Sequence, residues 1–523
     1  MRIALIQIDP SPRGGSDIPF SHYNQTEPLG LLSLASALEQ GNHEVILIHP
    51  NVDHPNPFSS HRALRSIRRF RPDILAVSCM TRQVPAARAF VADARLIVPE
   101  SLTVVGGDHF SATPHDLALF PEFDVAVSGE GEVALQWIID HRREQWEIHT
   151  VPTGVYWRNG NRIEGHGVAS RIGKLDALPP PKRLYSLLAS SYVGTLMYPP
   201  RSQQTGMASV YASRGCPYSC SYCDAAQVWG KRIVERAPEQ VVDELREVIR
   251  QHGVNTAFFV DLTFNVNRRR LLELCATLEQ AQLELSWYVL LRPGAPNSPL
   301  HVDRQVLEAL KRAGCMKVGF GVETISPEIS KDLNRLKGNG HLIEATRIMD
   351  ELGILSKAFF IIGHPAENSD YHHQLVEYLN QLCADEIRMS FLTPFPGTPL
   401  WHQYKDQLPR PENYEAYSTF EPLISHPVFS VEELHRIRLT ILSQYYSGKS
   451  YREHVIAKVQ AHPNLGKVFH EFSEYTEEEV LRADNFIRSL AVSTGQSPTS
   501  KRNSRLTYNY AEAVGKKIQV SIQ

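Results

Sequence analysis

Short apolar runs alternate with amphipathic segments along the first part of the chain. The runs that we predict to be buried strands are Ile3–Ile8, Glu44–Ile48, Asp73–Ser78, Leu102–Val105 and Val125–Val127. Between them, apolar side chains recur at helical spacing, at Leu29, Leu32, Ala35 and Leu38 and again at Ala89, Val91, Ala92 and Leu96. The alternation predicts a doubly wound parallel sheet with helices on both faces, within residues 1–150.

A second alternating stretch occupies residues 201–400. Its predicted strands are Thr256–Asp261, Ser286–Leu291, Met316–Val322, Ser356–Ile362 and Ile387–Leu392. Its predicted helices are Glu239–Gln251, Arg268–Gln280, Gln305–Ala313, His341–Leu352 and Tyr371–Cys383. A repeated β/α unit of this kind predicts a second parallel sheet, with any chemistry at the carboxyl ends of its strands.

The remaining segments differ in character from these two stretches. Residues 151–200 are expected to form a linker, because Trp157–Arg162 suggests a small hairpin and Pro179–Pro181 a stiff connector. Residues 401–495 are expected to be helical, with amphipathic helices at Val431–Tyr446 and Tyr475–Leu490. Residues 496–523 are polar and are expected to form a tail.

Composition narrows the class of protein. The 523 residues are 42% hydrophobic and 21% charged, which is typical of a soluble globular enzyme. A formal net charge of -3 argues against sequence-independent binding of nucleic acid, which needs a basic surface. The apolar runs are shorter than the roughly 20 residues that cross a bilayer, so no membrane span is predicted. Because the chain enters a strand at once without a leader, we expect a cytoplasmic location.

Three cysteines on one short segment carry the sharpest chemical signal. Cys216, Cys220 and Cys223 have the spacing CxxxCxxC, and cysteine thiolates are the usual ligands of a [4Fe-4S] cluster. A cubane normally takes four such ligands, so three leave one iron open to another molecule. The alternative is a structural zinc site, but no second Cys-x-x-Cys or Cys/His half is near, since the other four cysteines stand alone.

This motif, with Tyr222 directly before the third cysteine, resembles the radical S-adenosylmethionine (SAM) enzymes. The resemblance implies a partial (β/α)6 barrel and a SAM molecule that chelates the open iron. It also implies SAM contacts at Tyr222 and at strand ends, namely Thr263, Asn265, Arg292, Glu323 and Gly363. A carboxylate such as Glu323 can accept two bonds from ribose hydroxyls, and Arg292 can pair with the SAM carboxylate. Each residue could instead be a turn or capping group.

The predicted strand ends of the first stretch resemble the cobalamin-binding domain found ahead of many radical SAM cores. The residues that the resemblance implies as cobalamin contacts are Ser78, Thr81, Gly106, Gly107, His109, Ser111, Gly129, Glu130, Gly131 and Glu132. Asp108 directly precedes His109, unlike the Asp-x-His-x-x-Gly ligand motif of cobalamin mutases, so we expect His109 to pack against the corrin rather than ligate cobalt. The alternative is a flavodoxin-like module that holds no cofactor.

The resemblance implies a cobalamin-dependent radical SAM methyltransferase that acts on an unactivated carbon of a small biosynthetic substrate. Its cofactors would be a [4Fe-4S] cluster, SAM and cobalamin, and its partner an external electron donor of the flavodoxin or ferredoxin type. One alternative is a radical cyclase or ring-rearranging enzyme without methyl transfer. Another is a non-catalytic cluster-bearing sensor or scaffold. The residues themselves name no catalytic acid or base and no substrate.

Overall fold

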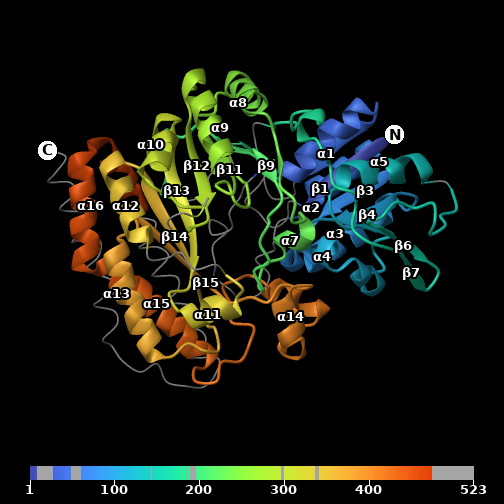
Figure 1. The fold of residues 1–523 in the computed structure, drawn as a ribbon. Coiled ribbons are helices and arrows are strands. Elements are labelled where there is room, and N and C mark those ends of the chain that lie inside the picture. Colours follow the sequence, from blue (N-terminus) through green and yellow to red (C-terminus); the bar gives the residue numbers. More distant parts are fainter. Residues whose placement is uncertain are drawn as a thin grey trace.

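The computed structural model describes residues 1–8, 27–48, 60–142, 144–184, 187–188, 196–295, 298, 300–335 and 341–473. Two parallel sheets stand side by side in Figure 1, one in the blue N-terminal part and one in the green and yellow central part. The expected helix Tyr475–Leu490 and the expected tail 496–523 lie outside the described residues.

The N-terminal sheet has the strand order β2-β1-β3-β4-β5, and these five strands are parallel. The strands are β1 (Arg2–Gln7), β2 (Glu44–Ile48), β3 (Ile74–Ser78), β4 (Leu102–Gly106) and β5 (Val125–Val127). The helices are α1 (Leu29–Gln40), α2 (Ser60–Phe70), α3 (Val84–Ile97), α4 (Asp108–Ala112) and α5 (Gly131–His141). One apolar core joins the sheet to α1 and α5 and another joins it to α2 and α3, so the expected flavodoxin-like, doubly wound fold is confirmed.

The hairpin expected near residue 157 belongs to this sheet. Its strands β6 (Val155–Asn159) and β7 (Arg162–Gly165) add antiparallel to the edge at β5. Val155 and Trp157 point into the same core as Val125 and Val127, and this burial attaches the hairpin to the sheet. The segment expected as a linker therefore begins with two strands of the N-terminal sheet.

The central sheet has the order β8-β11-β12-β13-β14-β15, is parallel throughout and is open, as a partial barrel requires. Its strands are β8 (Met207–Val210), β11 (Thr256–Phe259), β12 (Ser286–Leu291), β13 (Cys315–Glu323), β14 (Leu355–Ile362) and β15 (Glu386–Phe391). The covering helices are α8 (Pro238–His252), α9 (Arg268–Ala281), α10 (Arg304–Arg312), α12 (Leu342–Leu352) and α13 (Ser369–Leu382). The smaller elements are β9 (Ser213–Arg214), α7 (Ala225–Val228), β10 (Val234–Glu235), α11 (Pro327–Asp332) and α14 (Pro399–Tyr404). The expected (β/α)6 barrel is confirmed.

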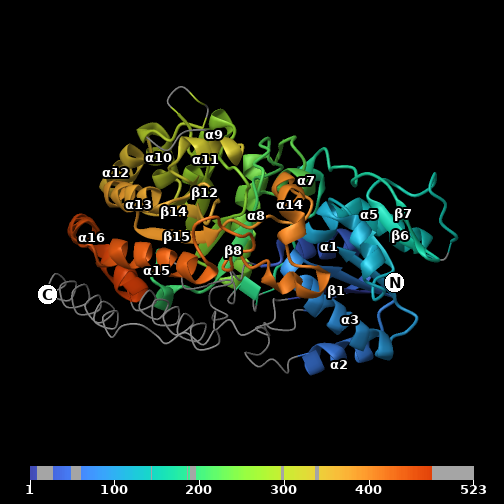
Figure 2. The same cartoon turned by 90° about the horizontal axis from the view of Figure 1, so that it is seen from below.

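Two C-terminal helices cover one side of the barrel. α15 (Val431–Ser447) packs against α13, and α16 (Lys449–Ala461) packs against α12, on the side away from the N-terminal sheet (Figures 1 and 2). Sequence periodicity predicts α15 but not α16. Within the described part of the chain, no helix is long and apolar enough to cross a membrane.

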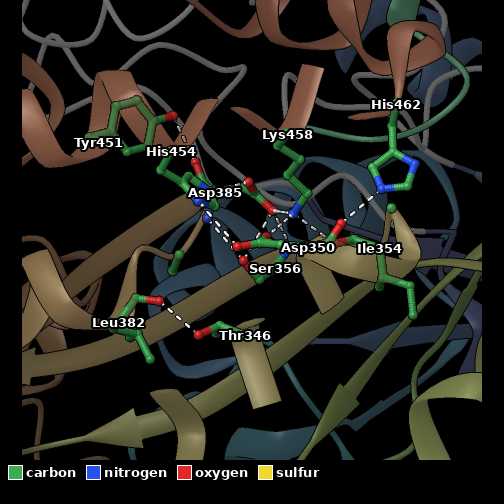
Figure 3. A network of polar contacts seen from close by, with 12 residues as sticks. Thr346, Asp350, Ile354, Ser356, Leu382, Asp385, Tyr451, His454, Lys458 and His462 are labelled. Carbon is green, nitrogen blue, oxygen red and sulfur yellow. Dashed lines mark hydrogen bonds and ion pairs between the residues drawn. The ribbon is translucent and has the colours of Figure 1, made fainter. Parts of the chain in front are cut away.

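A buried network of charges fastens α16 to the barrel (Figure 3). The Lys458 ammonium lies 2.5 Å from Asp385 and 2.8 Å from Asp350, and His454 contacts the same two carboxylates at 2.9 and 3.2 Å. The Ser356 hydroxyl donates to Asp385 as well. Because Asp385 and Ser356 stand at the amino ends of β15 and β14, this network lies at the end of the barrel opposite the strand termini that carry chemistry.

Polar contacts between described residues join the N-terminal domain to the rest of the chain at several places. The Arg214 guanidinium beside the cysteine loop contacts Glu132 at 2.9 Å and Glu130 at 3.4 Å, and all three side chains are at most 7% exposed. Buried Arg183 likewise bridges Glu27, at 2.7 Å, to Glu244 on α8. Tyr414 from the C-terminal region donates its hydroxyl to Asp116, 3.0 Å away. The Arg214 and Arg183 contacts are buried ion pairs. Removing one partner of such a pair destabilises the protein, because the other charge stays buried without a counter-charge.

Replacing Arg214 with methionine is expected to destabilise the protein strongly, because Glu130 and Glu132 would stay buried without their cation. The expected cost is about 3 to 5 kcal/mol, seen as a fall of roughly 3 to 5 °C in the midpoint of thermal unfolding. The matched control is Arg246→Met, whose partner Asp243 is exposed, and it should cost less than about 1 kcal/mol. Equal effects of the two variants would contradict the docking role of Arg214.

The charge state of His454 should make stability depend on alkaline pH. Burial alone would lower its pKa, but Asp350 and Asp385 raise the pKa from 6.5 to about 9. The stabilising charge is thus fully present below pH 6.5 and is lost as the pH rises through about 9. Thermal unfolding of the wild type between pH 6 and 10 should show this loss, whereas His454→Gln should give a flatter profile. His373→Gln, at an exposed site, should reproduce the wild-type profile.

Candidate active site

The cysteine loop is fixed to the carboxyl end of β11 by one buried carboxylate. Asp261 accepts bonds from the Ala212 amide at 2.9 Å and the Ser213 hydroxyl at 2.5 Å, just before the loop begins. Burial raises the pKa of Asp261 to about 6. Gly215 has φ +108°, and a Cβ there would lie 2.2 Å from the Arg232 carbonyl oxygen, so only glycine fits this turn.

The loop places the three cysteines in one sheltered region. Cys216 and Cys220 are buried and Cys223 is partly buried. Burial, together with the neighbouring Asp224 carboxylate and the other two sulfurs, raises the pKa of the Cys223 thiol to about 12. The thiol therefore stays protonated here unless a cation, such as the iron of a metal cluster, contacts the sulfur and stabilises the thiolate.

The spacing of the three sulfurs argues against a single zinc ion. Sulfur ligands of a tetrahedral zinc ion lie roughly 3.8 Å apart, given Zn–S bonds of about 2.3 Å. Among the described residues, only Asp350, Asp385 and His454 form a set of three or more possible ligand atoms that all lie within 4.8 Å of one another. At least one pair among the three cysteine sulfurs is therefore more than 4.8 Å apart, which is wider than one zinc ion requires. In the Asp350 set, the Lys458 ammonium already supplies the cation.

Arg292 is poised beside the cysteines. It follows β12, its Nη1 lies 3.4 Å from the Cys220 sulfur, and its guanidinium lies 3.8 Å from the centre of the Tyr218 ring. The side chain is 94% buried, and its Nε and Nη2 have no hydrogen-bond partner among the described residues. Two unsatisfied donors of one buried guanidinium fit a bidentate carboxylate, as the SAM amino-acid group would present.

Asn265 positions this arginine instead of facing an open site. Its side-chain oxygen accepts from the Arg292 amide at 2.9 Å, and its side-chain nitrogen donates to the Arg292 carbonyl at 2.8 Å. The Leu300 carbonyl takes a second bond from the same nitrogen. Thr263 lies nearer the cysteines, with its hydroxyl 3.9 Å from the Cys216 sulfur. Both residues are buried.

Glu323 ends β13 in a strained backbone conformation. It has φ +66° and lies where the register against β14 shifts, which turns its side chain away from the regular pleat. Its carboxylate lies 3.5 Å from Arg335, a residue that sequence analysis missed. Burial and the Glu323 charge raise the pKa of Tyr222, so this tyrosine belongs to the same region. At the end of β14, the Gly363 amide donates to the buried Glu367 carboxylate at 3.0 Å.

A cavity of about 770 Å³ lies where the two sheets meet. Eight of the residues expected to contact cobalamin line it: Ser78, Gly106, Gly107, Ser111, Gly129, Glu130, Gly131 and Glu132. Its other walls include Tyr211, Arg214, Leu290, Arg388 and residues 418–420. A Cβ at Gly30, which also lines it, would meet no atom within 4 Å, so bare backbone faces open space here. A large flat ligand such as a corrin fits such a floor.

The backbone conformation at residue 107 requires glycine. Its φ is +92°, and a Cβ would come within 2.8 Å of the Cys79 backbone, so glycine allows β4 to turn into α4 against the end of β3. Asp108–Ala112, directly after this turn, form the short helix α4. The Ser111 amide donates to the Gly107 carbonyl and stabilises this helical turn.

His109 and Thr81 do not line the cavity. His109 is 1% exposed, its Nδ1 lies 3.2 Å from the Thr81 hydroxyl, and its Nε2 lies 3.3 Å from Asp116. The ring packs edge-on against Tyr414, with 5.1 Å between ring centres. Both nitrogens thus have protein partners, and the histidine packs behind the cavity instead of presenting a free nitrogen to it.

Comparison with known proteins adds an independent finding. The B12 binding domain model matches residues 19–139, and the Radical SAM superfamily model matches residues 210–379. An uncharacterised methyltransferase of Pyrococcus horikoshii is 26% identical over 80% of this chain and 87% of its own length. An anaerobic magnesium-protoporphyrin IX monomethyl ester cyclase of Cereibacter sphaeroides is 25% identical over 73% of this chain and 61% of its own length.

A solved structure agrees on the fold. The radical SAM methyltransferase TsrM from Kitasatospora setae, solved with cobalamin and a [4Fe-4S] cluster bound, superposes with a TM-score of 0.61 over 78% of this chain and 75% of its own. The two chains are 20% identical, so this likeness concerns the fold. With both domain models in this order and the cysteine loop facing the cobalamin-domain edge, the chain belongs to the cobalamin-binding radical SAM enzymes.

Proposed function

We propose that this protein is a cobalamin-dependent radical SAM methyltransferase that methylates an unactivated carbon of a small molecule. The observation that carries the proposal is a cavity whose lining combines the glycine-rich edge of the N-terminal sheet with Leu290 and Arg388 of the barrel and with Gly215, the residue before Cys216. Two reagents and a substrate must meet in one space for such a reaction, and a cavity that is lined by both domains supports the proposal.

The residues have separate roles in this proposal. Cys216, Cys220 and Cys223 would hold the cluster, and Arg292 would bind the SAM carboxylate through its two free donors. Glu323 would bind the ribose hydroxyls. When bound, these cofactors supply a 5'-deoxyadenosyl radical that abstracts hydrogen and a methyl group carried by cobalamin. An external flavodoxin or ferredoxin would supply electrons, and we propose the reducing cytoplasm as the setting.

A second candidate is a radical cyclase, favoured by the 25% identity to the magnesium-protoporphyrin cyclase. The two reactions leave different coproducts. Methyl transfer converts a second SAM to S-adenosylhomocysteine, whereas cyclisation forms 5'-deoxyadenosine without it. Methyltransferase is part of the name of both the first relative and the solved structure, which supports methyl transfer for this chain.

Reconstitution tests the cluster directly. After anaerobic incubation with iron, sulfide and hydroxocobalamin, the wild type should bind about four irons per chain and one cobalamin. With dithionite it should cleave SAM to 5'-deoxyadenosine, and with substrate it should also release S-adenosylhomocysteine. Cys220→Ala should lose nearly all cluster iron and cleavage. The control Cys275→Ala, at a buried lone cysteine of α9, should keep both. An iron-free wild type would reject the proposal, and turnover without S-adenosylhomocysteine would favour the cyclase.

Arg292 offers a finer test of SAM recognition. Arg292→Met should keep its iron but bind SAM about 10- to 100-fold more weakly, because a charge-assisted hydrogen bond is worth about 1.5 to 3 kcal/mol. The SAM affinity of Arg292→Lys should lie between those of the wild type and Arg292→Met, since lysine keeps the charge but not the planar guanidinium. Equilibrium dialysis of SAM against the reconstituted proteins measures the effect, with iron content as the control. Unchanged SAM affinity in Arg292→Met would contradict this role.

A further inference from the structure

One group of four charged residues inside the barrel holds more positive than negative charge. Lys317 of β13, Lys357 of β14, and Glu386 and Arg388 of β15 stand on the strand faces opposite to the residues packed beneath the helices, such as Val318, Ala358 and Met389. Four lumen-facing charges therefore comprise three cations and one carboxylate.

Both oxygens of this carboxylate are already used. Lys317 lies 2.5 Å from one oxygen of Glu386, and Lys357 lies 2.6 Å from the other. Burial, with the charges of Lys317 and Arg388, lowers the pKa of Lys357 to about 8 despite its carboxylate partner. Glu386 thus does not balance the cations around it, and a further negative charge would be stabilised nearby.

Arg388 is the cation of this group that faces the shared cavity. Its guanidinium lies 5.0 Å from the centre of the Phe420 ring, which belongs to the C-terminal region and also lines the cavity. A second guanidinium, that of Arg438, lies 5.5 Å from the same ring. Among the residues that the structure describes, no hydrogen bond or ion pair occupies the Arg388 nitrogens. The aromatic contact holds the group in place and leaves its donors to a ligand.

We propose that Arg388 is a specificity residue that binds an oxyanion of the substrate, a carboxylate or a phosphate, from within the barrel. This inference rests on the proposed function, because it assumes that the substrate enters the cavity between barrel and cobalamin domain. Guanidinium suits both anions, since its planar donors match two oxygens at once. A substrate anchored by its anionic group at Arg388 would present its remaining carbons toward the strand ends, where the cysteine loop lies.

Anion binding to the reconstituted protein tests this assignment. The protein, carrying cluster, cobalamin and SAM, is dialysed against radiolabelled inorganic phosphate or acetate at constant ionic strength. SAM is present so that Arg292 is occupied. The wild type should bind about one equivalent of one of the two anions, and which one it prefers separates phosphorylated from carboxylated substrates. Arg388→Met should bind the preferred anion at least tenfold more weakly than the wild type. The affinity of Arg388→Lys should lie between those of the wild type and Arg388→Met. Arg410→Met, at an exposed site outside the cavity, should match the wild type.

Three results would overturn the assignment. They are no binding of either anion by the wild type, equal binding by Arg388→Met, and a loss of cobalamin from Arg388→Met with anion binding retained. The last would mean that the guanidinium serves the corrin side chains. The dialysis measures binding alone, so its outcome is separate from that of the proposed function. S-adenosylhomocysteine formation without anion binding would reject only the anionic substrate, and anion binding without SAM cleavage would reject only the methyltransferase.

Discussion

The Arg214 guanidinium lies between Glu130 and Glu132 at the point where two parallel sheets end against each other. Parallel strands leave their loops at one edge, and each sheet alone would offer an open crevice there. Docking the two edges face to face turns two crevices into one cavity. The Arg214 contacts also connect the strand-end turn of the N-terminal domain to the chain just before the cysteine loop, so they link the cofactor positions that we expect in the two domains.

Buried polar groups are paired at one end of the barrel and unpaired at the other. At the amino ends of β14 and β15, the charges of Asp385, His454 and Lys458 are paired with one another, as buried charges in a stable core must be. At the other end, the buried Arg292 keeps two donors without hydrogen-bond partners among the described residues, and in the lumen the partly exposed Arg388 contacts the Phe420 ring. Unpaired buried donors cost stability, so their presence on the side of the cavity points to ligands.

The strands were the most predictable part of the fold. β2 and β12 begin and end at the residues expected, because each is a short apolar run that the local sequence marks off from its neighbours. Helix α16 escaped prediction, since its burial depends on Asp350 and Asp385, which lie far away in the chain. The hairpin at Val155–Gly165 was expected, but not the sheet that it would join, because turn residues specify a hairpin locally and an edge partner does not appear in the local pattern.

By itself, the sequence determined the chemistry that the protein can hold: three cysteines at cluster spacing and glycines at strand ends, both of which depend on neighbours a few residues apart. Only the tertiary structure decided which side chains share the cavity. Thr81 and His109 lie behind the cavity wall, and the Asn265 side chain bonds the Arg292 backbone. Arg335 contacts Glu323, and Arg388 lines the cavity, although no local sequence pattern predicts either position. The reason is physical, because burial and charge pairing are set by contacts between residues distant in the chain.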